Sequence, residues 1–228
     1  MAFCVSIEWD YVWPSFPGTR VYFTSRDLCS RTMMHSGQKE FLRATPIIDH
    51  DHPAVRQKAL ALAEGCKGDE EIARNCFVFV RDEIRHSWDY KTNPVTLSAS
   101  SALEHTTGYC FAKSHLLAAL LRANRIPAGL CYQRLKNHSD VGPAFYLHGL
   151  NAIWLEPFGW YRADARGNRG NVHAEFTPPE EHLAHVPNEP GETDLTGIFS
   201  DPLPVVVELL TKYTDYMDVR RNMPDVEE

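Results

Sequence analysis

Apolar residues recur at helical spacing in four stretches of the chain. The predicted helices begin at Pro53, at Asp69 and at Cys110, and a fourth covers residues 203–217. Leucine and alanine dominate the helix that begins at Cys110, and Pro127 follows its end, where proline is expected. A helix of this composition is expected to be buried in the domain.

Three later stretches favour strands. Residues 128–135, 145–155 and 160–163 are rich in residues that prefer sheets, and a Glu-Pro-Phe-Gly turn over residues 156–159 separates the last two. The short connection favours antiparallel pairing. Helices followed by antiparallel strands predict an α+β fold, with the helices packed on a small antiparallel β-sheet.

The pattern divides the chain into three parts. Residues 1–40 are an N-terminal extension of uncertain order, with strand-like alternation from Val5 to Tyr11. Residues 41–221 form the main domain, in which residues 166–200 are expected to be mostly loop with one strand near 172–176. Residues 222–228 are a polar tail that is expected to be frayed.

Composition narrows the class of protein. The net charge is −7 and there is no basic tract, so we expect no nucleic-acid partner. The six cysteines are scattered without a Cys-x-x-Cys pair, which disfavours a disulfide scaffold and favours a reducing, cytoplasmic location. No apolar run reaches membrane-spanning length and no signal peptide is recognised, so no membrane partner is expected. The oligomeric state is left open.

Cys110 stands at the predicted start of a helix. Free N–H groups and the helix dipole favour negative charge there, which stabilises a thiolate and can hold an oxyanion. Taken alone, the residue is slightly better explained as a buried core cysteine. A base is available in His148, on a predicted strand. Asp164 ends the next strand, and a turn centred near residue 157 or 158 would place residue 164 opposite about residue 151, within diagonal reach of His148. Nucleophile, base and orienting acid would then stand together.

Other polar residues have plainer interpretations. His50 and His52 resemble metal ligands, but helix capping in a solvated loop is preferred. His182 and His185 would need further ligands to bind zinc, and none is evident. Asn168 is an alternative to Asp164 as orienting group, although turn chemistry explains it better. We therefore expect neither a metal nor a cofactor.

Three motifs together resemble the transglutaminase-like (transglutaminase core) superfamily, which is papain-like. They are the Gly-Tyr-Cys at 108–110 with its leucine- and alanine-rich continuation, the His-Gly at 148–149, and the Trp-Tyr-Arg-Ala-Asp at 160–164. The order and spacing of the motifs match that family. The resemblance spans roughly residues 41–177, weakens towards 215 and leaves out residues 1–33.

The resemblance implies a catalytic domain over residues 41–221, with Cys110 as nucleophile, His148 as general base and acid, and Asp164 as orienter. A thioester acyl-enzyme would form from a protein or peptide amide. The oxyanion would be held by the Cys110 N–H and one side-chain donor, for which Trp88 and Tyr90 are candidates.

The expected activity is hydrolysis of an amide or peptide bond by a cysteine protease or amidohydrolase. Transamidation of a protein glutamine (cross-linking or deamidation) and removal of an asparagine-linked glycan would use the same three residues. Two alternatives of another class remain. One is a non-catalytic binding module on the same fold. The other is a partner-binding protein that uses the aromatic segment around Trp9, Tyr11 and Trp13.

Overall fold

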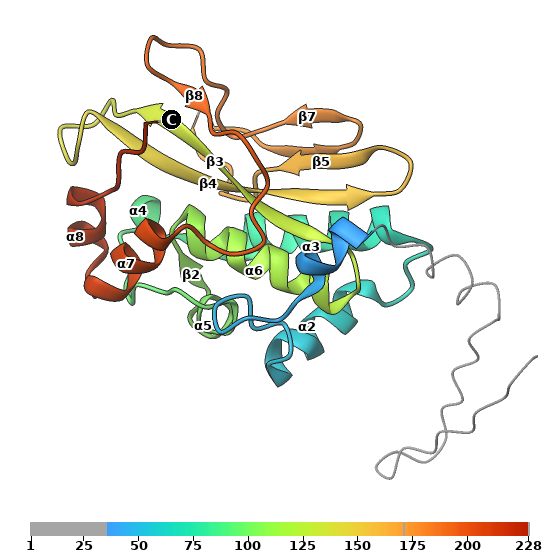
Figure 1. Ribbon diagram of the computed structural model, residues 1–228. Helices are drawn as coiled ribbons and strands as arrows, with labels where there is room; N and C mark the ends of the chain where they lie inside the picture. Colours follow the sequence, from blue (N-terminus) through green and yellow to red (C-terminus); the bar gives the residue numbers. More distant parts are fainter. Residues whose placement is uncertain (1–35, 171, 228) are drawn as a thin grey trace, which may run out of the picture. The chain divides into compact units, whose positions relative to one another are not determined.

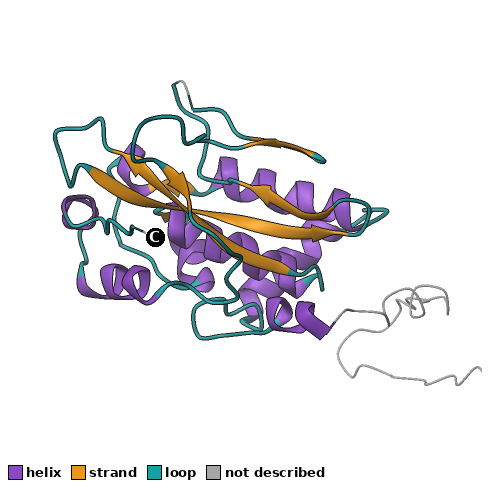
Figure 2. Ribbon diagram, turned by 45° about the horizontal axis from the view of Figure 1, so that its top comes forward, coloured by secondary structure: helices purple, strands orange, loops and turns teal. Residues whose placement is uncertain are grey.

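Helices and an antiparallel sheet form two layers, which Figures 1 and 2 show from two directions. The computed structural model describes residues 36–170 and 172–227, and the strand-like alternation from Val5 to Tyr11 lies outside this part of the chain. Within it, no helix is long and apolar enough to cross a membrane.

The elements follow one another along the chain as helices first and strands later. The first half contains η1 (Ser36–Leu42), α2 (Pro53–Ala63), α3 (Asp69–Glu83), β1 (Arg85–His86), α4 (Ser87–Tyr90), α5 (Ala99–His105), β2 (Thr107–Gly108) and α6 (Cys110–Ala123). The second half contains β3 (Ala128–Lys136), β4 (Phe145–Leu155), β5 (Gly159–Ala163), β6 (Glu175–Thr177), β7 (Glu180–His182), β8 (Thr193–Asp194), α7 (Pro204–Lys212) and α8 (Tyr216–Arg221). The four-stranded antiparallel sheet has the order β5-β4-β3-β8. The predicted α+β class is confirmed.

Helix α6 is the centre of the fold. Every residue from Cys110 to Arg122 is buried, because α2, α3 and α5 pack against one part of the helix and strands β3 and β4 against another. A helix that is apolar on nearly all sides is stable only in such surroundings. The first residue of α6 is therefore held by the core itself.

Strand β4 presents alternate residues to the two faces of the sheet, as the pleat requires. Asn151 faces α6, where its Nδ2 donates to the carbonyl oxygen of Ser114 at 2.9 Å. Leu150 and Ala152 belong to a separate small apolar cluster with Leu183.

Three predictions about the second half of the chain are corrected. The helix expected over residues 203–217 is two helices, because Tyr213 is extended and the Asp215 side chain caps α8 by accepting from Met217 N at 2.8 Å. Residues 166–200 contain three short strands, and the strand expected near 172–176 is β6, shifted to 175–177.

The third correction concerns the polar tail, which is tied down over its described residues 222–227. Leu147 N donates to Pro224 O at 2.7 Å, and Arg134 forms ion pairs with Asp225 and Glu227. These contacts join the tail to β3 and β4. The prediction that this segment is frayed is therefore wrong, because Arg134 and the edge of β4 hold it.

Candidate active site

Cys110 is the first residue of α6 and is preceded by an unusual cap. Tyr109 occupies the N-cap position but gives no side-chain hydrogen bond to the helix; its hydroxyl instead donates to Tyr216 O at 2.6 Å. The N–H groups of the first turn therefore receive no oxygen from the cap, although a helix start needs acceptors. Gly108 permits this close turn, because a Cβ there would lie 2.9 Å from the Cβ of Ala112.

His148 and Asp164 meet across the β4–β5 hairpin. The Nε2 atom of His148 lies 2.7 Å from Oδ2 of Asp164, and both side chains are almost completely buried. The carboxylate can only accept, so Nε2 carries the proton. The register pairs Ala163 with Asn151, which brings the next residue, Asp164, diagonally across from His148. The two residues lie close together as predicted, although the residue opposite Asn151 is Ala163 instead of Asp164.

The Cys110 thiol is a second partner of the same imidazole. Burial by itself would lower the pKa of His148, but the charges of Asp164 and Cys110 and hydrogen bonds to both raise it to about 10. Burial likewise opposes ionisation of Asp164, yet the His148 charge and hydrogen bond keep the pKa of that carboxyl below its ordinary value. The structure thus brings Cys110, His148 and Asp164 together around one imidazole, whose pKa lies above its ordinary value.

A partly buried ion pair holds the segment that carries Asp164. The backbone N–H of Arg166 donates to Oδ1 of Asp164 at 3.1 Å, and the Arg166 guanidinium binds both carboxylate oxygens of Asp89 at 2.8 and 3.1 Å. Asp89 belongs to α4, so the chain after β5 is fastened to the helical layer. Both oxygens of Asp164 have a partner, which fixes the carboxylate plane.

His86, which the sequence did not single out, lies in the same region. Its ring packs edge-on against Tyr109, with centroids 5.5 Å apart, and its buried Nδ1 has no hydrogen-bond partner among the described residues. Burial, followed by the charge of Arg166, holds the pKa of His86 well below its ordinary value, so the ring is neutral. The one feature that could have singled out His86 is its place in the two-residue strand β1, which pairs with β2 just before Cys110.

The C-terminal helix α8 and the start of β4 surround the thiol on another side. The Arg220 guanidinium lies between two rings, 5.2 Å from the centroid of Trp88 and 4.9 Å from that of Tyr146. The pKa of Tyr146 is raised, mainly by burial and then by the charge of Cys110. Cys110 itself is only 3% exposed.

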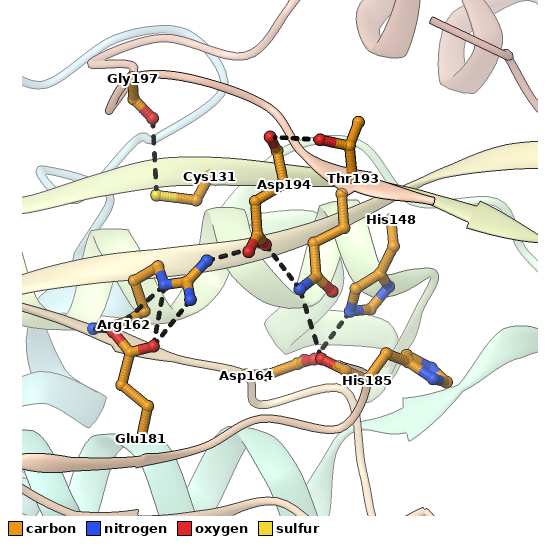
Figure 3. A network of polar contacts seen from close by, with 10 residues as sticks. Cys131, His148, Arg162, Asp164, Glu181, His185, Thr193, Asp194 and Gly197 are labelled. Atoms are coloured by element: carbon orange, nitrogen blue, oxygen red, sulfur yellow. Dashed lines mark hydrogen bonds and ion pairs between the residues drawn. The ribbon is translucent and has the colours of Figure 1, made fainter. Parts of the chain in front are cut away.

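His185 is the second residue that the sequence did not assign to this site. Its ring stands edge-to-face on His148, with centroids 5.0 Å apart and an angle of 84° between the planes (Figure 3). The sequence presents it only as a weak zinc candidate beside His182. His182 instead bonds Thr177, with 2.6 Å between Nδ1 and Oγ1. In the described part of the chain no cluster of three or more His, Cys, Asp or Glu side chains could hold a metal.

The candidates for the side-chain oxyanion donor have other contacts. Tyr90 is 56% exposed and carries the guanidinium groups of Arg85 and Arg169 on its ring. Trp88 packs against Tyr216, with centroids 6.4 Å apart, and against Arg220. The donor therefore stays unassigned.

The remaining polar candidates have local roles. Asn168 makes a pair of hydrogen bonds with the backbone of Ala174, at 2.8 and 3.3 Å, which is the expected turn chemistry. His50 bonds Leu42 O through Nε2 at 3.1 Å, and His52 occupies the N-cap of α2 without a side-chain bond. His52 therefore occupies the predicted capping position, but its side chain makes no capping hydrogen bond.

Comparison with known proteins gives a family match over the centre of the chain. Residues 56–165 match the Transglutaminase-like superfamily. This range includes α3, α6 and the β4–β5 hairpin, and with them Cys110, His148 and Asp164. No curated protein matches the chain.

Three solved structures are similar at low identity. A candidate cysteine protease from Cytophaga hutchinsonii is 17% identical, with a TM-score of 0.48, and the match covers 59% of this chain and 43% of that one. The periplasmic domain of TgpA from Pseudomonas aeruginosa is 18% identical, with a TM-score of 0.42 and coverages of 56% and 46%. A candidate protease from Parabacteroides distasonis is 12% identical, with a TM-score of 0.37 and coverages of 55% and 26%. The chain thus spans less than half of each of these structures.

Proposed function

Because residues 56–165 match the Transglutaminase-like superfamily, we propose that the chain is a cysteine-dependent hydrolase of amide or peptide bonds. In this proposal Cys110 is the nucleophile, His148 the general base and acid, and Asp164 the residue that orients His148. The substrate is a protein or peptide amide.

One observation carries the proposal. A single buried imidazole has Asp164 on its Nε2 atom at 2.7 Å and the thiol of Cys110 as its other partner. An imidazole that holds a proton beside a thiol favours the thiolate, which is the attacking form. A core cysteine has no need of a neighbouring histidine and carboxylate, so this arrangement favours catalysis over a binding module.

The reaction follows from these positions. The sulfur of Cys110 attacks the carbonyl carbon, and the oxyanion that forms lies near the uncapped N–H groups of α6. His148 gives its proton to the amide nitrogen, the C–N bond breaks, and an amine leaves behind a thioester. A water molecule, deprotonated by His148, then attacks the thioester. A carboxylic acid leaves and the thiol regains its proton. Asp164 stays ionised and holds the imidazole in one orientation.

The first test is the rate at which iodoacetamide labels Cys110 as a function of pH, followed by mass spectrometry. Fast labelling of Cys110 below about pH 7, and slow labelling in His148→Ala, are expected for a thiolate that depends on the histidine. The partly exposed Cys66 supplies a reference thiol in the same sample. Labelling of Cys110 only near the free-thiol pKa of about 8.5 would remove the nucleophile from the proposal.

A second test separates hydrolysis from transamidation. A glutamine-donor peptide is incubated with a labelled amine, and the products are separated by mass. Release of ammonia and formation of the acid without amine incorporation supports hydrolysis. Incorporation of the label in excess over acid would instead make the protein a transamidase, since an amine rather than water would then resolve the thioester.

A further inference from the structure

The segment between β7 and β8 passes close to His148 of β4. It brings the ring of His185 edge-to-face against that of His148, 5.0 Å between centroids (Figure 3). His148 has Asp164 at one nitrogen and Cys110 as its other partner. A third group therefore contacts the imidazole without taking part in either of these interactions.

A buried glutamine holds His185 in place. Gln133 is completely buried on β3, directly opposite His148 in the β3–β4 register. Its Nε2 donates to the backbone oxygen of His185 at 3.3 Å and to Oδ1 of Asp194 at 2.9 Å. One amide group thus ties the position of His185 to the strand next to the one that carries His148.

The segment is also anchored on both sides of His185. Before it, Leu183 is buried in an apolar cluster with Cys131 and Leu150. After it, Asp194 pairs with Arg162 at 2.8 Å, and Arg162 in turn binds the carboxylate of Glu181 at 2.8 Å (Figure 3). Because these anchors lie on three strands of the same face, the backbone at His185 cannot move away from His148 without breaking several contacts.

The charges around the two rings indicate how His185 acts. Asp164 and Cys110 face His148, and His148, Asp164, Arg166 and Glu192 act on His185. Burial, followed by the charge of His148, lowers the pKa of His185 to about 3. The ring is therefore neutral at neutral pH, and it acts on its neighbour by packing and by excluding water. Excluding water strengthens the electrostatic interaction between an imidazolium and a carboxylate.

We propose that His185 is a positioning residue: its ring covers the His148–Asp164 pair and prevents rotation of the His148 imidazole, so that Cys110 keeps its base. This inference rests on the proposed function. It adds a role for a residue beyond the nucleophile, the base and the orienting acid, and it assigns Gln133 the task of holding that residue.

The test compares His185→Ala with His185→Phe, which keeps a flat ring. The labelling rate of Cys110 by iodoacetamide is measured at about pH 6 and about pH 9.5 in each protein. The ratio of the two rates cancels any change in access to the thiol. In His185→Ala this ratio is expected to fall about tenfold, which corresponds to one pH unit in the ionisation of the pair. His185→Phe is expected to stay within about twofold of the wild type, a small part of that unit.

His182→Ala is the matched control, because His182 is an exposed histidine at the end of β7, just before this segment. It should leave the ratio unchanged. Urea unfolding of all variants shows whether each one folds. An unchanged ratio in folded His185→Ala overturns the inference while the fast labelling of the wild type keeps the proposed function intact.

A second readout does not depend on thiol reactivity. The Nε2 proton of His148, bonded to Asp164, is expected as a downfield proton NMR signal that disappears in His148→Ala. Shielding by His185 predicts that the signal persists in the wild type and in His185→Phe and is lost to solvent exchange in His185→Ala. If the wild-type thiol is not activated, the proposed function fails, and this signal alone then decides the role of His185. Persistence of the signal in His185→Ala would refute shielding.

Discussion

Replacing Lys113 by methionine tests the energetics of α6, the helix that begins at Cys110. Lys113 lies one turn after Cys110 on α6 and is only 1% exposed. Its ammonium donates to the carbonyl oxygens of Ile84 and Arg81, the latter at 3.3 Å, where α3 ends. A cation at a helix C-terminus is favourable, but here it must be desolvated. Methionine keeps the length of the side chain and removes the charge.

The pKa of Lys113 determines the sign and size of the effect. Burial lowers it from 10.5 to about 7, with a further contribution from Arg166. Between these two values the unfolded chain binds a proton that the folded chain has released, so stability rises with pH in this window. The single-site gain between pH 7 and pH 9 is about 2 kcal/mol. Below about pH 7 the slope vanishes, because the proton is then bound in both states.

Two buried cysteines oppose this gain at the upper end of the window, and His148, whose pKa is raised from 6.5 to about 10, opposes it across the whole window. His148 is present in wild type and variant, so its contribution cancels when the two are compared. Burial raises the pKa of Cys76 and of Cys131 to about 12, while the unfolded thiols ionise near 9.0. Together they remove less than about 1 kcal/mol at pH 9. Because both cysteines are present in wild type and variant, subtraction of the two pH curves leaves the contribution of Lys113.

The assay is urea unfolding followed by tryptophan fluorescence at pH 7, 8 and 9. The wild type should gain stability relative to Lys113→Met by about 2 kcal/mol across this range. Lys67→Met, at an exposed lysine, should run parallel to the wild type. Parallel curves for wild type and Lys113→Met would refute the reasoning, since they would mean that Lys113 titrates alike in the folded and unfolded chain.

Two further predictions concern packing around the candidate site. Gly149→Ala should destabilise the protein by about 1–3 kcal/mol, measured by urea unfolding, because the new Cβ would lie 2.8 Å from Cδ1 of Phe111. An unchanged unfolding midpoint would show that the Phe111 ring moves aside freely. Arg220→Met should raise the labelling rate of Cys110 roughly tenfold at fixed pH, because it removes two cation–π contacts, with Trp88 and Tyr146, that are worth about 0.5–1 kcal/mol each. An unchanged rate would mean that α8 does not limit access to the thiol.

The main elements could be predicted from the sequence because each is long enough for its pattern of apolar residues to be recognised. Helices α2, α3 and α6 begin at the predicted residues, and β4 has the predicted bounds of 145 and 155. The hairpin turn also indicated that residue 164 would lie opposite about residue 151, and Ala163 is the observed partner of Asn151. Regular elements and a short turn are local properties, and the sequence records them directly.

Short elements and their contacts could not be predicted in this way. Strands β6, β7 and β8 have two or three residues each, too few for a period to show. The pairing of β8 also depends on a distant partner, since Asp194 pairs with Gln133 of β3. His185 could not be assigned for the same reason, since its contact with His148 comes from the path of a segment that carries no regular pattern of its own. The break between α7 and α8 depends on Asp215, which bonds Asn93 far back in the chain.

The relation between His148 and Asp164 depends finally on the register of one hairpin. β5 pairs with β4 only over residues 151–155, so the β4 edge beside His148 has no β5 partner and Asp164 can approach there. The three-residue turn is closed by Phe158 N donating to Leu155 O at 2.8 Å, and Gly159 follows with φ of +77°, a conformation that favours glycine. A slip of one residue would turn the Asp164 side chain to the other face of the sheet. The turn therefore specifies the His148–Asp164 bond, although it lies far from the thiol.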